Sequence, residues 1–215
     1  MIRRGEPWGS PVGGPPVARG AGGDAALAEL VQEHPGARLE FRPDPSCDLA
    51  RAVGLTPAAS GAVELALDAI ALDDDTTAVN AVVSGRAPDR PRGWHRRRPV
   101  KVRVDDRVAY DGRATTVVVA NGQFLRGADL VPRGHPGDGR LEVQVYAVAP
   151  AQRSQLRRLL PGGGHLPHPQ IATATGRRVE VVWSRPMPLE VDGRARGRRG
   201  TLGAAVVPAA FLLVV

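Results

Sequence analysis

From Val63 onward, short apolar runs alternate with tight-turn pairs, and this alternation constrains the fold more than any other feature of the chain. The pairs Asp111-Gly112, Asn121-Gly122 and Asp192-Gly193 are typical of hairpin turns. Many short strands separated by such turns indicate an antiparallel sandwich or barrel. The strands expected are Val63–Leu67, Thr77–Val83, Val100–Val104, Arg107–Tyr110, Thr115–Ala120, Leu141–Val148, Arg178–Trp183, Pro188–Val191 and Val206–Val215.

The first part of the chain has a different pattern. Residues 1–20 are rich in glycine and proline and are expected to be irregular. A helix is predicted over Ala25–Glu33, a strand over Arg38–Phe41 and a second helix over Asp48–Val53, which is an α/β order. The predicted fold class is therefore α+β.

We expect a truncated α/β piece, similar to a nucleotide-binding domain, over residues 1–57, followed by an antiparallel β-sandwich over residues 58–215. The last strand is free to return to the first piece. One helix, Ala151–Leu160, is expected to interrupt the sandwich. Its pattern predicts that Arg153, Arg157 and Arg158 face outward and that Leu156, Leu159 and Leu160 face inward.

The charge and the cysteine content limit the possible functions but do not identify one. A formal net charge of +7 is compatible with nucleic acid, anionic lipid headgroups or nucleotide phosphates. Nucleic acid is not expected, because aromatic residues do not interleave with the arginines and no helix-turn-helix or zinc motif is present. The single Cys47 excludes an internal disulfide and fits a reducing cytoplasm. Arg3 and Arg4 precede no apolar run, so no secretory signal is expected.

Gly22-Gly23-Asp24 stands directly before the first predicted helix. Glycines let a backbone approach phosphate closely, and a helix N-terminus offers free N–H groups and a positive partial charge. Asp24 could orient a metal ion or a hydroxyl group there. A plain helix cap is the alternative interpretation.

Two further acidic turns are candidates for chemistry. Asp138 and Glu142 flank Gly139 and could share a hard cation such as Mg²⁺ through oxygen ligands. Asp192 precedes Gly193 near the end of an apolar run. A bare turn explains the first pattern equally well, and a hairpin explains the second.

The order of these motifs resembles the bacterial diacylglycerol kinases, which are related to sphingosine kinases and more remotely to NAD kinases. That family has Gly-Gly-Asp-Gly-Thr opening a helix, then Gly-Thr-x-Asn-Asp-Phe-Ala-Arg-x-Leu-Gly, a hydrophobic strand ending in Asn-Gly, a Pro…Asp-Gly turn and a late Val-x-x-Asp-Gly-Glu. The matching segments here are 22–26, 44–54, 117–121, 132–143 and 189–194.

The resemblance implies an α/β nucleotide-binding domain, a C-terminal β-sandwich, and ATP and Mg²⁺ as cofactors. It implies nucleotide contacts at Gly22, Gly23, Asp24 and Asp48, catalytic roles for Asp24 and Asp192, and metal ligands at Asp138 and Glu142. The partner it implies is a lipid substrate or a membrane surface.

Departures from the family motifs predict weak or lost phosphoryl transfer to a lipid hydroxyl. The strand–helix–strand unit that usually precedes Gly-Gly-Asp is expected to be missing. Ala25 and Ala26 replace a glycine and a threonine, and Arg194 stands where the family has its catalytic glutamate. Arginine cannot accept a proton at neutral pH. The alternative is a non-catalytic lipid- or nucleotide-binding or regulatory module. A cytoplasmic location is expected, with peripheral membrane association and the oligomeric state left open.

Overall fold

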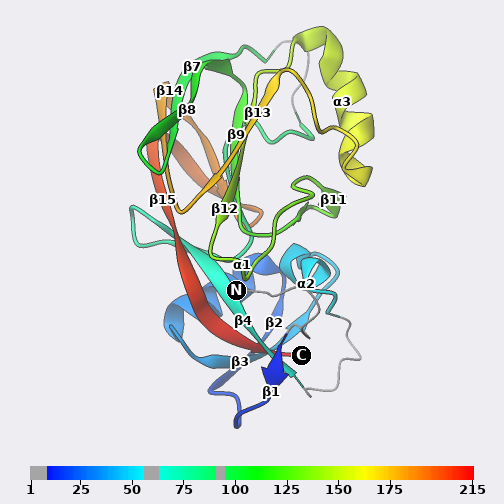
Figure 1. Cartoon of the computed structure of the whole chain (residues 1–215), viewed down its shortest axis with the longest axis vertical. Coiled ribbons are helices and arrows are strands. Elements are labelled where there is room, and N and C mark those ends of the chain that lie inside the picture. Colours follow the sequence, from blue (N-terminus) through cyan, green and yellow to red (C-terminus); the bar gives the residue numbers. More distant parts are fainter. Residues whose placement is uncertain (1–8, 56–62, 91–94) are drawn as a thin grey trace.

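The computed structural model of the chain describes residues 9–55, 63–90 and 95–215. Figure 1 shows an elongated molecule in which a β-sandwich stands on a smaller α/β part that also holds the C-terminus. One 13-stranded sheet runs through both parts, and a two-stranded ribbon of β10 (Phe124–Leu125) and β11 (Ala128–Asp129) lies beside it. The predicted class, an α/β piece followed by an antiparallel sandwich, is confirmed. The predicted boundary at Pro57 lies outside the described residues.

Three strands of the α/β part run parallel to one another, whereas β1 pairs antiparallel with β4 (Val63–Leu72). β2 pairs with β3, and β3 pairs with the far end of β15 over Leu212–Val214. Helix α1 covers this sheet, and its buried residues Leu27 and Val31 pack against Leu39 and Phe41. The elements are β1 (Ser10–Pro11), β2 (Ala18–Gly22), α1 (Asp24–Glu33), β3 (Arg38–Pro43) and α2 (Asp48–Ala52).

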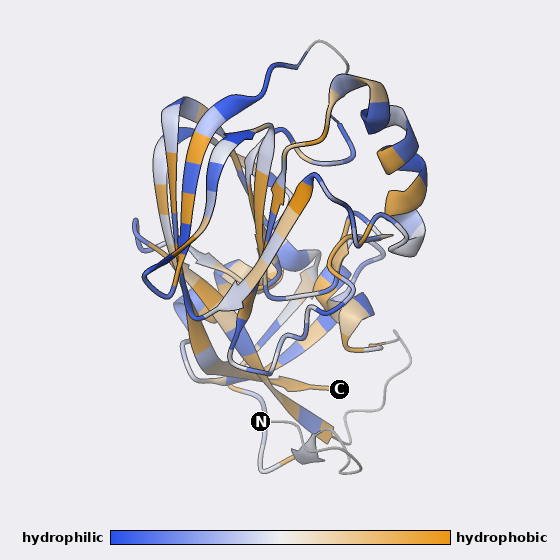
Figure 2. Cartoon of the chain, turned by 45° about the horizontal axis from the view of Figure 1, so that its top comes forward, coloured by the Kyte–Doolittle hydropathy of each residue, from blue (hydrophilic) through white to orange (hydrophobic). Residues whose placement is uncertain are grey.

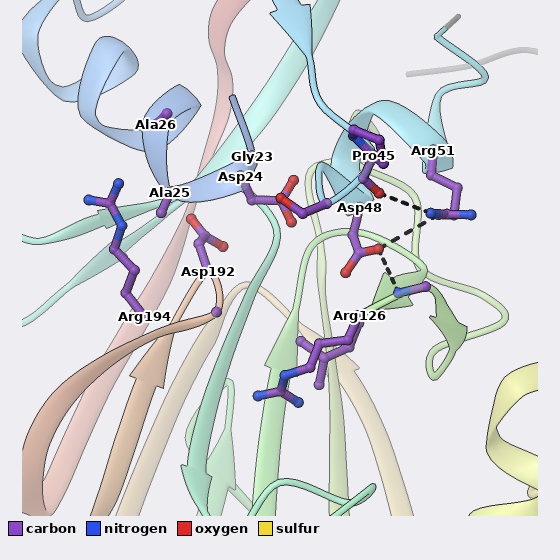
Figure 3. Close-up of a pocket in the computed structure, with 14 residues that line it drawn as sticks. Gly23, Asp24, Ala25, Ala26, Pro45, Asp48, Arg51, Arg126, Asp192 and Arg194 are labelled. Atoms are coloured by element: carbon purple, nitrogen blue, oxygen red, sulfur yellow. Dashed lines mark hydrogen bonds and ion pairs between the residues drawn. The ribbon is translucent and has the colours of Figure 1, made fainter. Parts of the chain in front are cut away.

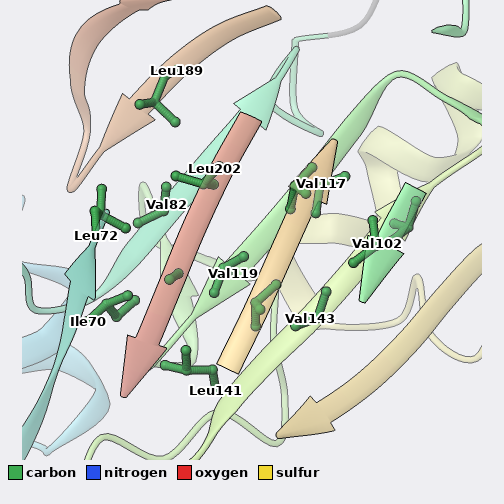
Figure 4. Close-up of a cluster of buried hydrophobic side chains, with 14 of the residues drawn as sticks. Ile70, Leu72, Val82, Val102, Val117, Val119, Leu141, Val143, Leu189 and Leu202 are labelled. Atoms are coloured by element: carbon green, nitrogen blue, oxygen red, sulfur yellow. The ribbon is translucent and has the colours of Figure 1, made fainter. Parts of the chain in front are cut away.

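All pairings within the sandwich are antiparallel, and valine dominates its main core (Figure 4). Val82, Val102, Val119 and Val143 are at most 1% exposed, so the apolar faces of the alternating strands meet each other. The strands are β4 (Val63–Leu72), β5 (Thr77–Ala78), β6 (Ala81–Gly85), β7 (Arg98–Val104), β8 (Arg107–Ala114), β9 (Thr116–Ala120), β12 (Leu141–Tyr146), β13 (Ile171–Gly176), β14 (Arg178–Val191) and β15 (Arg194–Val214).

The long hairpin of β14 and β15 joins the two parts. Its upper half pairs with β7 in the sandwich, and its tip reaches the first helix of the α/β part. The tip residues Asp192 and Gly193 both have positive φ, at 47° and 80°. Positive φ at both central residues is what a tight primed hairpin turn requires, and Asp-Gly is a favoured pair for it. The turn therefore fixes the direction of the Asp192 side chain.

A short helical segment covers one outer face of the sandwich, where the prediction of its faces was partly wrong. It consists of 3₁₀ turns at Pro150–Gln152 and Leu160–Gly162 around α3 (Arg153–Leu159). Arg153 is 2% exposed rather than outward-facing, because its guanidinium donates to the carbonyls of Val148 and His95. Leu159 is 41% exposed instead of inward-facing.

Other strands differ from the sequence-based expectation. β2 lies partly in the stretch expected to be irregular, and β13 was not predicted. β4 is longer than expected, the two strands predicted at 178–183 and 188–191 form one bulged strand, and β15 begins well before Val206. The strand predicted over Thr77–Val83 is broken at Val79 and Asn80. This break lies beside the candidate site.

No helix among the described residues is both long and apolar enough to cross a membrane. Hydrophobic and hydrophilic residues alternate along strands of the sandwich such as β7 (Figure 2).

Candidate functional site

A polar pocket of about 640 Å³ lies where the N-terminus of α1, the loop before α2, the β10–β11 ribbon and the β14–β15 turn meet. Figure 3 shows the carboxylates of Asp24 and Asp192 side by side near its centre. The lining residues are Gly23, Asp24, Ala25, Ala26, Pro45, Ser46, Asp48, Arg51, Leu125, Arg126, Gly127, Asp192, Gly193 and Arg194.

Asp24 is the first residue of α1 and is 6% exposed. It is not a plain cap, because its carboxylate binds groups outside its own helix. Leu49 N–H donates to Oδ1 at 2.9 Å, the Cys47 thiol donates to the same oxygen at 3.2 Å, and Asn80 Nδ2 donates to Oδ2 at 2.8 Å. Burial raises the pKa of Asp24 to about 7, and the neighbouring Asp192 adds to the rise.

Asp192 is buried at the hairpin tip, and three backbone N–H groups donate to its carboxylate. Val79 donates to Oδ2 at 2.7 Å, and Asn80 and Ala81 donate to Oδ1 at 3.0 and 2.9 Å. Burial raises its pKa to about 6, while these three hydrogen bonds act in the opposite direction. The break between β5 and β6 therefore has a cause: its N–H groups bind Asp192.

Asn80 connects the two carboxylates. Its backbone binds Asp192, and its fully buried amide donates to Asp24 and to the Phe124 carbonyl at 3.0 Å. Its Oδ1 has no hydrogen-bond partner among the described residues and lies where a Cβ on Gly122 would collide with it. Because Gly122 has no side chain, the Asn80 amide oxygen can occupy this space.

Asp48 lies at the side of the pocket, at the start of α2. Its Oδ1 accepts from Gly127 N–H at 2.8 Å and lies 3.7 Å from Arg51 Nε. Burial raises the pKa of Asp48, against the opposing hydrogen bonds and arginines. The Arg51 guanidinium also donates to the Pro45 carbonyl and lies 5.8 Å from the Phe124 ring centre. Asp48 thus joins α2 to the β10–β11 ribbon.

Three arginines supply positive charge to the pocket: Arg51, Arg126 and Arg194. Arg126 binds Asp89 at 3.1 Å and also pairs with Glu190. Arg194 forms an ion pair with Glu29 of α1, so its guanidinium is held at the rim beside Ala25 (Figure 3). It does not bind Asp24. Arginines around a helix N-terminus fit the phosphates of a nucleotide.

The two glycines of the first motif have different positions. Gly23 lines the pocket, and a Cβ there would lie 2.6 Å from Ser46 Oγ. Gly22 has a φ of 129°, ends β2 and is not among the lining residues. Gly22 thus lets the chain turn into α1, and Gly23 lets the loop before α2 approach closely.

Asp138 and Glu142 lie apart from this pocket. Asp138 is exposed and accepts from Arg140 N–H, whereas Glu142 binds the Thr175 hydroxyl. Burial raises the pKa of Glu142, and the charge of Asp138 contributes to the rise. Within residues 9–55, 63–90 and 95–215, no group of three or more ligand side chains could hold a metal ion. The metal role of this pair stays a prediction.

Sequence reasoning missed Asn80, Arg51 and Arg126. Asn80 carried a detectable signal, because a single amide within an apolar strand is costly to bury without hydrogen bonds. Arg126 did not: only the fold brings the β10–β11 ribbon beside α2.

Comparisons with known proteins agree with this geometry. The family model of the YegS C-terminal NAD kinase beta sandwich-like domain matches residues 92–215, more than half of the chain. A diacylglycerol kinase from Bacillus anthracis str. Sterne has a TM-score of 0.73 at 17% identity, over 91% of this chain and 75% of that one. An NAD kinase from Archaeoglobus fulgidus in complex with ATP has a TM-score of 0.52 at 14% identity, over 92% of this chain and 76% of that one. At these identities, the structures establish likeness of fold. No curated protein matches the chain.

Proposed function

Because the chain belongs to the family of the YegS C-terminal NAD kinase beta sandwich-like domain, we propose that it binds ATP in the pocket at the N-terminus of α1 and transfers phosphate to a lipid hydroxyl slowly or not at all. The resemblance to diacylglycerol kinases is confirmed at the level of the family. The nucleotide, the lipid and the rate belong to the proposal.

The observation that carries the proposal is the joint placement of phosphate-binding and acidic groups. Arg51, Arg126 and Arg194 line the pocket into which the N-terminus of α1 opens, and Asp24 and Asp192 lie in the same pocket. Phosphoryl transfer depends mainly on positioning and on neutralising phosphate charge, which such a set of side chains can provide.

Magnesium would enter with the nucleotide. In the described part of the chain, side chains do not form a metal cage. Mg²⁺ is commonly held by one or two carboxylates together with substrate phosphates and water. Asp24 and Asp48 line the pocket and have the oxygen ligands that this arrangement needs.

Slow transfer is expected from the state of the candidate proton acceptors. Asp24 and Asp192 are each held by three hydrogen bonds within the fold, so few of their lone pairs are left to accept a proton from a hydroxyl group. Arg194 occupies the position where the family has a glutamate and is paired with Glu29. Loss of a general base typically costs about 10²–10⁴-fold in rate.

Calorimetric titration of Mg·ATP tests the binding step. We expect Arg51→Gln to weaken ATP binding about tenfold or more, since it removes one charge-assisted contact. Arg19→Gln is the matched control, because Arg19 is exposed on β2 and does not line this pocket. Equal affinity of parent and Arg51→Gln, or no heat of binding at millimolar ATP, would overturn the proposed site.

A radiolabelled transfer assay with diacylglycerol in mixed micelles tests the second step. Turnover of about one per second or faster, within ordinary enzyme values, would overturn the expectation of slow transfer. ATP binding with no transfer would favour the alternative, a non-catalytic nucleotide-binding module. Transfer that appears only after a second protein is added would identify a regulatory subunit.

A further inference from the structure

Five arginines gather at the end of the sandwich away from the α/β part. We call this surface the arginine end; its members are Arg96, Arg97, Arg98, Arg113 and Arg185. Strand register brings them together. Pro99 on β7 is paired with Arg113 on β8, and Val100 is paired with Trp183 on β14. Continuing that antiparallel register places Arg185 level with Arg98. Three adjacent strands therefore present arginines at one edge.

These charges are not balanced within the fold. Of the residues that the structure describes, none forms an ion pair with any of the five. Further along the same strand, Lys101 and Arg103 are paired with Asp111 and Glu180. The pKa of Arg98 is lowered, first by the charge of Arg185 and also by Arg96 and Arg113. Cations that repel each other at one edge form a surface suited to an anionic partner.

We propose that the arginine end is a docking surface for an anionic phospholipid membrane. An exposed apolar side chain accompanies the arginines: Val182 on β14, three residues before Arg185, is 40% exposed. The carbonyl of His95 accepts from Arg153, which attaches α3 to the segment that carries Arg96–Arg98. Basic side chains with apolar neighbours are typical of surfaces that bind the lipid headgroup region.

A single-stranded nucleic acid is the less suitable partner. Its bases are usually bound by stacking on exposed aromatic rings. In the described part of the chain, the large hydrophobic side chains that are exposed are four valines and a leucine. The choice of lipid over other anions rests on the proposed function. The presence of a cationic surface that docks an anionic partner does not.

Docking and nucleotide binding can be tested separately. Arg185 and Val191 are six positions apart on β14, which is about 20 Å at the rise of a β-strand, and Val191 adjoins the pocket residue Asp192. Substitutions at the arginine end should therefore leave ATP affinity unchanged. Unchanged ATP affinity also shows that a variant is folded.

Co-sedimentation with vesicles tests the proposal. The vesicles are pure phosphatidylcholine, or phosphatidylcholine with one third phosphatidylglycerol. The test variant is Arg96→Gln/Arg98→Gln/Arg113→Gln/Arg185→Gln. Arg97 is kept because it donates to the Ala147 carbonyl. Arg113 also donates to a carbonyl, that of Arg97, and unchanged ATP affinity controls for the loss of this exposed hydrogen bond. The control removes the same charge from four other exposed arginines: Arg19→Gln/Arg107→Gln/Arg140→Gln/Arg177→Gln.

We expect the parent to bind only the anionic vesicles, and less strongly in 0.5 M NaCl. Each arginine near a membrane changes partitioning about fivefold, so the test variant should lose at least ~10²-fold. Equal binding of parent and test variant, or an equal loss in the control, would overturn the proposal. Tighter binding to single-stranded DNA than to vesicles, lost in the same variant, would overturn the choice of lipid. If the parent binds no ATP, the proposed function is wrong. The vesicle experiment still tests whether the arginine end binds an anionic membrane.

Discussion

Replacing Asp24 with asparagine should make stability less dependent on pH. The buried carboxyl has a pKa of about 7 in the folded protein, against an ordinary value of 3.8. Between these values the folded protein binds a proton that the unfolded chain has released. Lowering the pH through this window therefore stabilises the parent, and raising it destabilises the parent.

The magnitude follows from these two pKa values. Between pH 8 and pH 5, uptake of this proton adds about 3 kcal/mol to the free energy of unfolding of the parent. Asp24→Asn carries no such charge. It loses the hydrogen bond from Asn80 Nδ2, which costs about 1–3 kcal/mol. The variant should therefore be more stable than the parent at pH 8, and this advantage should disappear at pH 5.

Urea unfolding at both pH values measures the difference. Asp138→Asn is the control, since Asp138 is exposed and lies outside the pocket. The free energy of unfolding of the variant is compared with that of the parent at each pH, and the informative quantity is how this difference changes between pH 8 and pH 5. Contributions from other titrating groups are nearly the same in both proteins and therefore cancel. A change below about 1 kcal/mol, or one of opposite sign, would refute a buried Asp24 with a raised pKa.

Three further predictions address the pocket, the Asn80 amide beside it and the separate acidic turn at Asp138. Arg194→Glu restores a proton acceptor, so phosphate transfer to diacylglycerol should rise at least about tenfold in the labelled assay; an unchanged rate would show that the base is not limiting. Gly122→Ala should lower the free energy of unfolding by about 2–4 kcal/mol, because the new methyl group meets Asn80 Oδ1. Gly200→Ala, with nothing within 4 Å of the new methyl group, is its control in urea unfolding. Asp138→Asn should reduce the heat of magnesium binding if this turn holds the ion, and equal heats in parent and variant would remove that role.

The sandwich was predictable because its physical signals are local. Apolar alternation and turn pairs such as Asn121-Gly122 identify strands without knowledge of their partners. β2, with the sequence Ala-Arg-Gly-Ala-Gly, has no such signal and depends on pairing with β3 and packing beneath α1. The long β15 was underestimated because its first third, Arg194–Gly200, is polar and largely exposed.

The site was only partly predictable. Asp24, Asp48 and Asp192 were identified from motif order, and the fold brings all three to one pocket. Asn80 could be noticed as an amide within an apolar run, but its partner Asp24 could not be predicted, because the two lie more than fifty residues apart. The arginines at the rim could not be assigned from sequence because arginine is frequent throughout this chain.

The side chain at position 194 can change without changing the shape of the pocket. This explains how the fold tolerates an arginine at this position. The position of the β14–β15 tip is fixed by Asp192, which binds the N–H groups of Val79, Asn80 and Ala81. These contacts do not involve the side chain at position 194. The side chain of Arg194 reaches the pocket from the rim, where it meets Glu29. An arginine at this position, where the proposed function expects a proton acceptor, therefore leaves the turn, the two buried carboxylates and the pocket in place.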